Sequence, residues 1–436
     1  MLDRSRTAIR PVSPSIIALD PGAVFHPSDP IRNTVMTIIL AVHDTPEPAF
    51  YGLMAATAAA ERRLPLFHLA ADYDIGRYPD ACQHVLRAGG LVVSGLLWLE
   101  RLAGRSPGQA LTITACVQQA AGGDGVIPIG PSQRKALPLL TDRLAREGLP
   151  YRIWRTVARQ NGLVLEDQTH GRLMGDIWRP DAFSRWRRDV FAMATGRRPV
   201  RIALIGDRRD QTEAYPATLA ALGDAADALN IAVEVLFAAP KNLPRDPAAE
   251  LSAVDGILLP GGSDMGNVPG QLAAARHALQ HKVPTLGLCL GMQTMATAAL
   301  RQTPRWRDAN LAEACPDAPV KTFVPLCHPR PYGPHRLGEH AMRLRAGSQL
   351  AAILSTHDRL RYNHRYQLNP ELLEGLSACG LTVSATDAGG AIADAVELAD
   401  HPFYLGVQGH PELSSRQGAA HPLLVAWLSA AANPSR

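Results

Sequence analysis

The sequence predicts an α/β protein built from two doubly wound domains with mostly parallel sheets. Apolar runs of strand length alternate with alanine- and leucine-rich runs of helix length, which is typical of βαβ units. This alternation starts twice, once near residue 34 and again near residue 199. The chain of 436 residues is also longer than a single hydrophobic core usually grows. Two tandem domains follow from these observations.

The first series predicts a strand in TVMTIILAV, a helix in FYGLMAATAAAERR and a strand in LPLFHLAA. The second series predicts a strand in PVRIALIG, a helix in YPATLAALGDAADALN, a strand in IAVEVLFA and a strand in VDGILLPGG. The arginine-rich stretch FSRWRRDVFAMATGRRPVR between them predicts a solvated helix and a turn at Gly196. We therefore expect an extended arm at 1–30, an α/β domain at 31–196 and a second α/β domain at 197–436.

The composition excludes several classes of function. The formal net charge is only +4 and the arginines are scattered, so we expect no nucleic-acid partner. No window holds about 18 uninterrupted apolar residues and the N-terminus lacks an apolar signal region, so we expect a cytoplasmic protein without a membrane partner. No CxxC pair occurs, and the sequence predicts neither a metal site nor disulfides from its six cysteines, which are Cys82, Cys116, Cys289, Cys315, Cys327 and Cys379.

Cys289 lies in TLGLCLGMQ, where a buried strand is expected to pass into a helix. Glycines two places before and two places after the cysteine permit the tight turn that lifts a nucleophile above a sheet edge. The helix N-terminus behind it favours a thiolate. A cysteine in an apolar run is more often a core residue, so this motif needs support from elsewhere in the chain.

That support comes from two other segments. FYLGVQGHPELSSR reads as a strand that ends in His410 and Glu412, and positions two apart on a strand project to the same side, so the carboxylate can hold the imidazole. DGILLPGGSDMGN reads as a buried strand that runs into a glycine turn. We expect the backbone N–H groups of Gly262 and Leu290 to form an oxyanion hole. A side chain at Gly262 would block close approach of the substrate.

The order PGG, GLCLG and HPE resembles the class I (triad) glutamine amidotransferases, and most closely the glutaminase domain of CTP synthase. The segments DANLAE, AMRL, NHRYQLNP, ELADHPFYLGVQGHPELSSR and HPLLVAWLSAA also match that family in order. The resemblance covers about residues 184–432, including Trp186 in the expected linker helix. Tyr215 fits an Asp-Ala-Tyr motif of the family, although Glu213 stands at the position of the aspartate.

The resemblance implies that Cys289 attacks the amide of L-glutamine and that His410 protonates the departing ammonia and then activates water. Glu412 would position the histidine. The family positions that hold the glutamine correspond here to Gly291, Gln293, Glu313 and Arg365. Arg365 can pair with an α-carboxylate and Glu313 can accept from an α-ammonium group, whereas each alone reads equally well as a solvated polar residue. No cofactor is expected for the glutaminase reaction.

The chain also departs from the family. Tyr362 and Asn363 occupy two positions of a run of alternating Arg and His in the family, and GEHAMRLR replaces a glycine-rich segment that the family links to activation by GTP, so the sequence leaves open whether GTP activates this protein. Nothing in the first half fulfils the G-x-x-x-x-G-K-[ST] pattern of a phosphate loop, and GGLVVSGLLW lacks its lysine. ATP and Mg would be needed only if an activating domain or partner exists.

The ammonia acceptor is thus either the first domain or a separate subunit. The alternatives are a stand-alone γ-glutamyl or related amide hydrolase without an acceptor, and a non-catalytic ligand-binding or regulatory protein. In the first half, Cys116 follows a strand pattern but lacks flanking glycines, so we expect it in a core. GGDGVIPIGPSQR reads as an ordinary βα loop, and the run around His170 gives only weak evidence for a metal or acceptor site. The sequence leaves the oligomeric state open.

Overall fold

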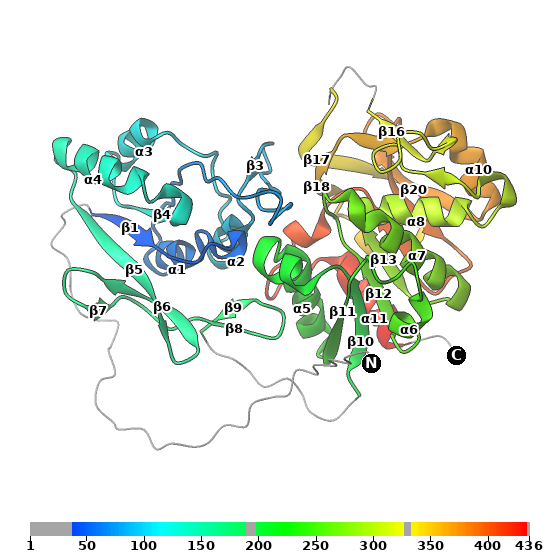
Figure 1. Ribbon diagram of the computed structural model, residues 1–436, viewed down its shortest axis with the longest axis horizontal. Helices are drawn as coiled ribbons and strands as arrows, with labels where there is room; N and C mark the ends of the chain where they lie inside the picture. The colour runs from blue at the N-terminus through cyan, green and yellow to red at the C-terminus, as the bar shows by residue number, and fades with distance from the viewer. Residues whose placement is uncertain (1–36, 189–197, 327–332, 434–436) are drawn as a thin grey trace.

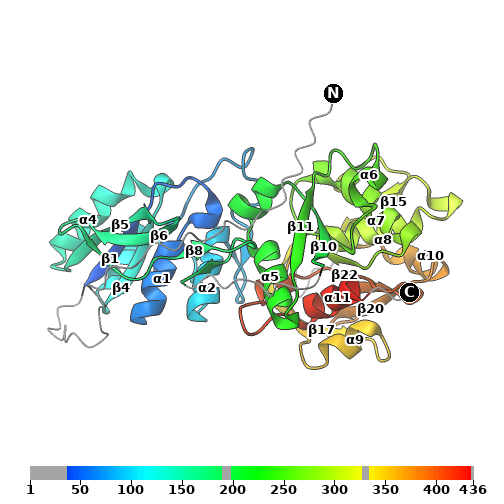
Figure 2. The same cartoon turned by 90° about the horizontal axis from the view of Figure 1, so that it is seen from below.

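The computed structural model describes residues 37–188, 198–326 and 333–433, and in it the two halves of the chain form two lobes that lie side by side (Figures 1 and 2). The expected arm at 1–30 and the expected domain boundary near residue 196 fall outside these residues. Both lobes are mixed α/β structures, which confirms the predicted class. No helix in the described ranges is long and apolar enough to cross a bilayer.

The N-terminal lobe is built on a sheet with the strand order β4-β1-β5-β6-β7. Strands β4, β1 and β5 are parallel, and β6 and β7 extend the sheet with antiparallel pairs. The elements are β1 (Ile38–Val42), α1 (Leu53–Arg62), β2 (His84–Val85), β3 (Leu91–Val92), α2 (Leu97–Ala103), α3 (Ile113–Ala120), β4 (Gly125–Ile129), α4 (Ala136–Arg146), β5 (Tyr151–Arg159), β6 (Gly162–Asp167), β7 (Arg172–Leu173), β8 (Arg179–Pro180) and β9 (Trp186–Arg187).

The C-terminal lobe has a larger sheet with the order β11-β10-β12-β13-β22-β21-β20-β17-β18, parallel from β11 to β22 and antiparallel beyond. Its elements are β10 (Val200–Ile205), α5 (Ala217–Leu229), β11 (Val233–Ala238), α6 (Pro247–Leu251), β12 (Gly256–Leu259), α7 (Val268–His281), β13 (Thr285–Leu288), α8 (Leu290–Leu300), β14 (Ala309–Asn310), β15 (Val320–Lys321), β16 (Phe323–Pro325), β17 (Arg336–Leu344), α9 (Gln349–Leu354), β18 (Arg359–His364), β19 (Tyr366–Leu368), α10 (Leu373–Ala378), β20 (Leu381–Asp387), β21 (Ala393–Leu398), β22 (Tyr404–Val407) and α11 (Pro422–Ala432).

The central strands β12, β13 and β22 position the site. Every residue in them is buried, because helices cover both faces of this parallel region, and the sequences GILL, TLGL and YLGV accordingly carry no charged side chain. Since these strands are parallel and adjacent, their carboxyl ends meet at one edge of the sheet. In open α/β sheets, that edge is where ligands bind.

Two expectations about individual elements were wrong. The stretch from 183 to 188 is not part of a solvated helix: Trp186 and Arg187 form β9, and Phe183 and Arg185 are buried. The Arg185 guanidinium contacts the carboxylates of Asp181, Asp224 and Asp227, so charge pairing buries an arginine that the pattern placed in solvent. The expected strand at 64–71 is reduced to isolated bridges at Leu66 and Leu69.

The two lobes contact each other through polar and apolar groups. The Arg101 guanidinium of α2 donates to both carboxylate oxygens of Asp224 on α5, at 2.9 and 2.7 Å. An apolar cluster joins the lobes beside this pair, with Val85 and Leu97 from the N-terminal lobe packed against Tyr215 and residues near it. The N-terminal lobe is therefore docked against the same edge of the C-terminal lobe that carries the strand ends.

Candidate active site

Cys289 lies between β13 and α8, as the glycine pattern predicts. Its backbone has φ 50° and ψ −105°, a conformation that costs a residue with a side chain about 1–3 kcal/mol and that tightly packed surroundings must enforce. The Cys289 N–H donates to the carbonyl of Val407 at 2.8 Å, which pins the turn to β22. The turn therefore presents the sulfur at the sheet edge, at the N-terminus of a helix.

The two glycines that flank the cysteine serve close packing. A Cβ atom at Gly287 would lie 2.4 Å from the Met295 sulfur, and a Cβ at Gly291 would lie 2.2 Å from the Leu259 carbonyl oxygen. Both distances are shorter than real Cβ contacts, so α8 can approach the strands only without these side chains. Gly291 was expected to bind glutamine, but the structure places its α-carbon against β12 and not among the residues that line the pocket.

His410 and Glu412 follow β22. The sequence predicts both residues on the strand, and this prediction is wrong: β22 ends at Val407, and residues 411–413 form a short 3-10 helix. The contact is nevertheless made: His410 Nδ1 lies 2.7 Å from Glu412 Oε1, and the Tyr215 hydroxyl donates to the same oxygen at 3.1 Å. Glu412 is fully buried. The carboxylate therefore fixes both the position and the tautomer of the imidazole.

The protonation of His410 is set by its neighbours. Burial opposes the imidazolium, but the charges of Glu412 and Cys289 outweigh it and raise the pKa of His410 well above its usual value. Nε2 of the ring has no hydrogen-bond partner among the described residues. That nitrogen faces away from Glu412, so it is available to the sulfur and to a substrate.

The glycine turn after β12 closes the site. A Cβ at Gly261 would lie 3.1 Å from His410 Cε1 and 3.3 Å from Cys289 Cβ, so this glycine lies directly against both side chains. A Cβ at Gly262 would lie 3.3 Å from Asp80 Oδ2 of the N-terminal lobe. The sequence predicts that the substrate approaches Gly262 closely, whereas in the structure the Asp80 carboxylate of the N-terminal lobe does so.

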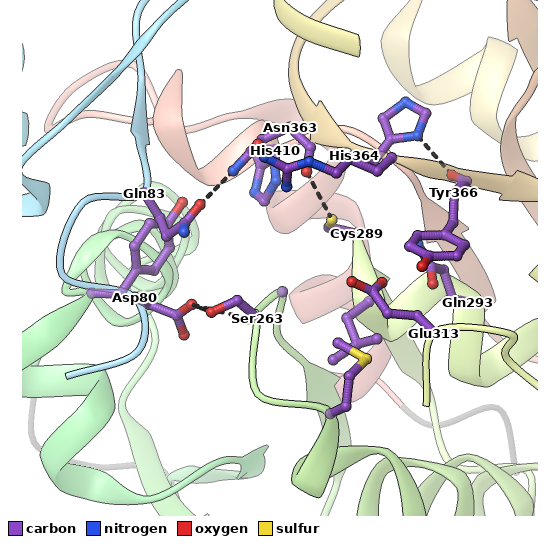
Figure 3. Close-up of a pocket in the computed structure, with 16 residues that line it drawn as sticks. Asp80, Gln83, Ser263, Cys289, Gln293, Glu313, Asn363, His364, Tyr366 and His410 are labelled. Atoms are coloured by element: carbon purple, nitrogen blue, oxygen red, sulfur yellow. Dashed lines mark hydrogen bonds between the residues drawn. The ribbon is translucent and has the colours of Figure 1, made fainter. Parts of the chain in front are cut away.

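A pocket opens over Cys289 (Figure 3). The pocket and the solvent at its mouth together occupy about 710 Å³. Seven predicted site residues line it: Gly262, Cys289, Leu290, Gln293, Glu313, Arg365 and His410. Leu290 is the first residue of α8, where backbone N–H groups have no helical partner. The pocket thus brings together every predicted site residue except Gly291 and the buried Glu412.

Polar groups surround this pocket at the end away from the glycine turn. Burial raises the pKa of Glu313, and the nearby Arg365 opposes that shift. Gln293 Nε2 donates to Gln408 Oε1 at 3.3 Å, and Gln293 Oε1 is buried without a partner among the described residues. An acid, a base and an unsatisfied amide oxygen can together receive an amino acid's ammonium and carboxylate groups.

Sequence reasoning missed several residues that line the pocket. Ser263, Met265 and Tyr366 belong to the C-terminal lobe, and Asp80 and Gln83 come from the N-terminal lobe. Asp80 and Gln83 follow DYDIGRYP, a stretch without regular secondary structure. This stretch faintly resembles an acidic segment of the CTP synthases but precedes GGLVVSGL instead of following it, so nothing in the sequence places these residues at the pocket.

The other cysteine and histidine candidates do not form a second site. Cys116 is fully buried in the N-terminal core, as expected, and burial raises the pKa of its thiol to about 12. Asp167, beside His170, is buried and accepts from Trp154 and Arg152. Within the described ranges no three His, Cys, Asp or Glu side chains are placed to hold a metal ion.

Comparison with known proteins agrees with this geometry. Residues 219–427 match the family glutamine amidotransferase class-I, so the C-terminal lobe is a class-I glutamine amidotransferase domain. A CTP synthase from Thermus thermophilus is 34% identical over 287 residues, covering 62% of this chain and 52% of the relative. A CTP synthase from Saccharopolyspora erythraea is 36% identical over 245 residues, covering 53% and 43%.

A solved structure also matches: the glutaminase domain of Trypanosoma brucei CTPS with bound acivicin, at a TM-score of 0.51 and 28% identity, covering 54% of this chain and 95% of that one. The chain spans about half the length of the curated relatives that it matches. The C-terminal domain is thus similar to the glutaminase part of CTP synthases.

Proposed function

We propose that the protein is a glutamine-dependent amidotransferase that hydrolyses L-glutamine to glutamate and ammonia and passes the ammonia to an acceptor in a CTP-synthase-like reaction. One observation carries this proposal: the ends of three adjacent strands bring Cys289, His410 and the glycine turn at 261–262 around one pocket. Nucleophile, base and oxyanion donors at these positions are what acyl transfer requires.

In this mechanism, the Cys289 thiolate attacks the side-chain amide carbon, and the N–H groups of Gly262 and Leu290 stabilise the oxyanion. The imidazolium of His410 gives its Nε2 proton to the amide nitrogen, the C–N bond breaks, and ammonia leaves behind a γ-glutamyl thioester. His410, now neutral, takes a proton from water, and the hydroxide displaces the sulfur to release glutamate. Glu412 keeps the imidazole oriented throughout.

Glutamine would lie with its α-ammonium group toward Glu313 and its α-carboxylate toward Arg365. This orientation uses the polar end of the pocket and leaves the side-chain amide at the sulfur. A planar guanidinium can bind a carboxylate through two parallel hydrogen bonds. This orientation would account for the position of Glu313 and Arg365, which are partly exposed, beside the buried Cys289.

The first domain is the proposed acceptor domain, because Asp80 and Gln83 form the pocket wall on that side. Its residues do not fit ATP held by a phosphate loop. The segment that comes nearest to such a loop is GGLVVSGLLW, where a Cβ at Gly95 would lie 2.4 to 2.9 Å from the carbonyl oxygens of Pro48, Tyr51 and Ala49. Carbonyl oxygens repel phosphate, so no step with ATP or Mg is assigned to this loop.

The test is glutamate release from L-glutamine by the full chain, compared with Cys289→Ala and with Cys116→Ala as the matched control. We expect release to fall to background in Cys289→Ala and to persist in Cys116→Ala, whose cysteine packs in the N-terminal core. A wild-type protein that releases no glutamate, alone or with UTP, ATP and Mg, would refute the proposal. Amide-15N glutamine then identifies the acceptor, since labelled nitrogen appears in the product.

A further inference from the structure

An irregular segment of the N-terminal lobe, here called the docking segment and comprising residues 78–83, lies against the mouth of the pocket. Figure 3 shows Asp80 and Gln83 from this segment pointing toward residues of the C-terminal lobe. Ser94 ties the two together, because its hydroxyl donates to the Asp80 carbonyl at 2.7 Å and accepts from the Gln83 N–H at 3.4 Å. Ser94 therefore fixes the backbone at Asp80 and at Gln83 relative to one another.

Asp80 holds the glycine turn. Its Oδ1 accepts from the backbone N–H of Ser263 at 3.0 Å and from the Ser263 hydroxyl at 2.8 Å. The Ser263 N–H belongs to the peptide that follows Gly262, so accepting this bond fixes the orientation of that peptide. The N–H of Gly262, the proposed oxyanion donor, belongs to the preceding peptide. Because the two peptides share the Gly262 α-carbon, fixing one of them restricts the orientation of the other.

Gln83 contacts the strand that lies over the sulfur. The side-chain amide of Asn363 on β18 donates to Gln83 Oε1, and the backbone carbonyl oxygen of the same asparagine lies 4.0 Å from the Cys289 sulfur. One residue of β18 therefore contacts both the Cys289 sulfur and the N-terminal lobe.

A second contact on β18 reaches the histidine. The buried guanidinium of Arg361 donates to Glu100 Oε2 at 2.5 Å and to the Val85 carbonyl at 3.0 Å, both in the N-terminal lobe. The Arg361 carbonyl in turn accepts from the backbone N–H of His410 at 2.8 Å. One lobe thus holds the backbone segments that support the oxyanion turn, the cysteine and the histidine.

We propose that the N-terminal lobe is a built-in positioning module of the glutaminase, with Asp80 and Gln83 as positioning residues of that site. The inference rests on the proposed glutaminase function. It assigns no contact with the reacting atoms to either residue: both act through Ser263 and Asn363. Any ligand that shifts the docking segment would thereby change the rate of glutamine hydrolysis.

The test compares Asp80→Ala with Asp80→Asn, which keeps an oxygen acceptor for Ser263 but removes the charge. Asp74→Ala is the matched control, since Asp74 in the same stretch caps only its own turn at Gly76 and Arg77. We expect Asp80→Ala to lower kcat for glutamine hydrolysis about 10- to 100-fold, below the cost of removing an oxyanion donor outright, with KM changed less than about threefold. Asp80→Asn should recover most of that loss, and Asp74→Ala should match the wild type.

Two results would overturn the proposal. An unchanged kcat in Asp80→Ala would show that the contact positions nothing, and a raised kcat would show that the carboxylate obstructs the oxyanion hole. Thermal unfolding of each variant establishes that it is folded. If Asp80→Ala does not fold, the comparison is made between Asp80→Asn and the wild type. Failure of the proposed function itself is seen separately, as the absence of hydrolysis by the wild type. In that case the rate at which iodoacetamide alkylates Cys289 still compares the variants.

Discussion

Replacing Glu412 by glutamine tests the electrostatic part of the account most sharply. The substitution keeps an oxygen that can accept from His410 Nδ1 at the observed 2.7 Å but removes the negative charge. Two unit charges about 4 Å apart interact by about 4 kcal/mol at an effective dielectric constant of about 20. At about 1.4 kcal/mol per unit, the pKa of His410 should fall by about 3 units in Glu412→Gln.

The direction of the expected change follows from the raised pKa of His410 in the wild type. There the imidazolium persists at neutral pH beside the Cys289 sulfur, so iodoacetamide should alkylate Cys289 faster in the wild type than in Glu412→Gln at pH 7. Glu412→Gln removes the charge that favours the imidazolium, so the protonated form of His410 is less populated at neutral pH than in the wild type. Alkylation at pH 7 should then be slower than in the wild type, by at most about 10³-fold if the whole electrostatic contribution is lost.

The assay is the alkylation rate against pH, measured by intact mass, with kcat/KM for glutamine measured in parallel. Glu371→Gln is the matched control, because Glu371 occupies the same Pro-Glu-Leu sequence in a short 3-10 helix but is exposed. Superimposable pH profiles for Glu412→Gln and the wild type would refute the reasoning. The control should behave as the wild type throughout.

Three further predictions concern groups around the site and the core. Tyr215→Phe removes the hydroxyl that donates to Glu412 and should lower kcat about 3- to 10-fold without loss of the fold, as thermal unfolding would verify. Gly261→Ala places a methyl group against the catalytic pair and should lower kcat more than about tenfold, while a KM change alone would contradict the packing argument. Burial lowers the pKa of His421 to about 3, and its Nδ1 accepts from the Leu423 N–H, so the folded state binds fewer protons than the unfolded state below pH 6.5. Stability should therefore fall on acidification, and His421→Asn should reduce the slope of the unfolding free energy by about 1.4 kcal/mol per pH unit between pH 4 and 6 in urea titrations.

The sequence predicts that Cys289, His410 and Glu412 come together because each lies in a short local motif, and the structure places them around one pocket. The glycines around Cys289 and the pair His410 and Glu412 are read within a few residues of one another, and the strands before them are uniformly apolar. The same locality leaves the role of Gly291 open, since a glycine required for packing against Leu259 looks the same in sequence as one that binds a ligand.

The contribution of the N-terminal lobe could not be predicted in this way. Asp80 and Ser263 are 183 positions apart, and the segment that carries Asp80 has no periodicity to place it in space. Arg185 shows the same limit in the core, because an arginine-rich stretch reads as solvated unless the three aspartates that bury it are known. Long-range polar pairing leaves no pattern in a single sequence.

Acid-quenched mass spectrometry during turnover tests the central claim most directly. The full chain is mixed with L-glutamine, stopped at short times and analysed by intact mass and then by peptide. We predict an adduct with the mass of one γ-glutamyl group on Cys289 that forms and decays within turnover. Glutamate release without such an adduct, or an adduct on another cysteine, would contradict the account.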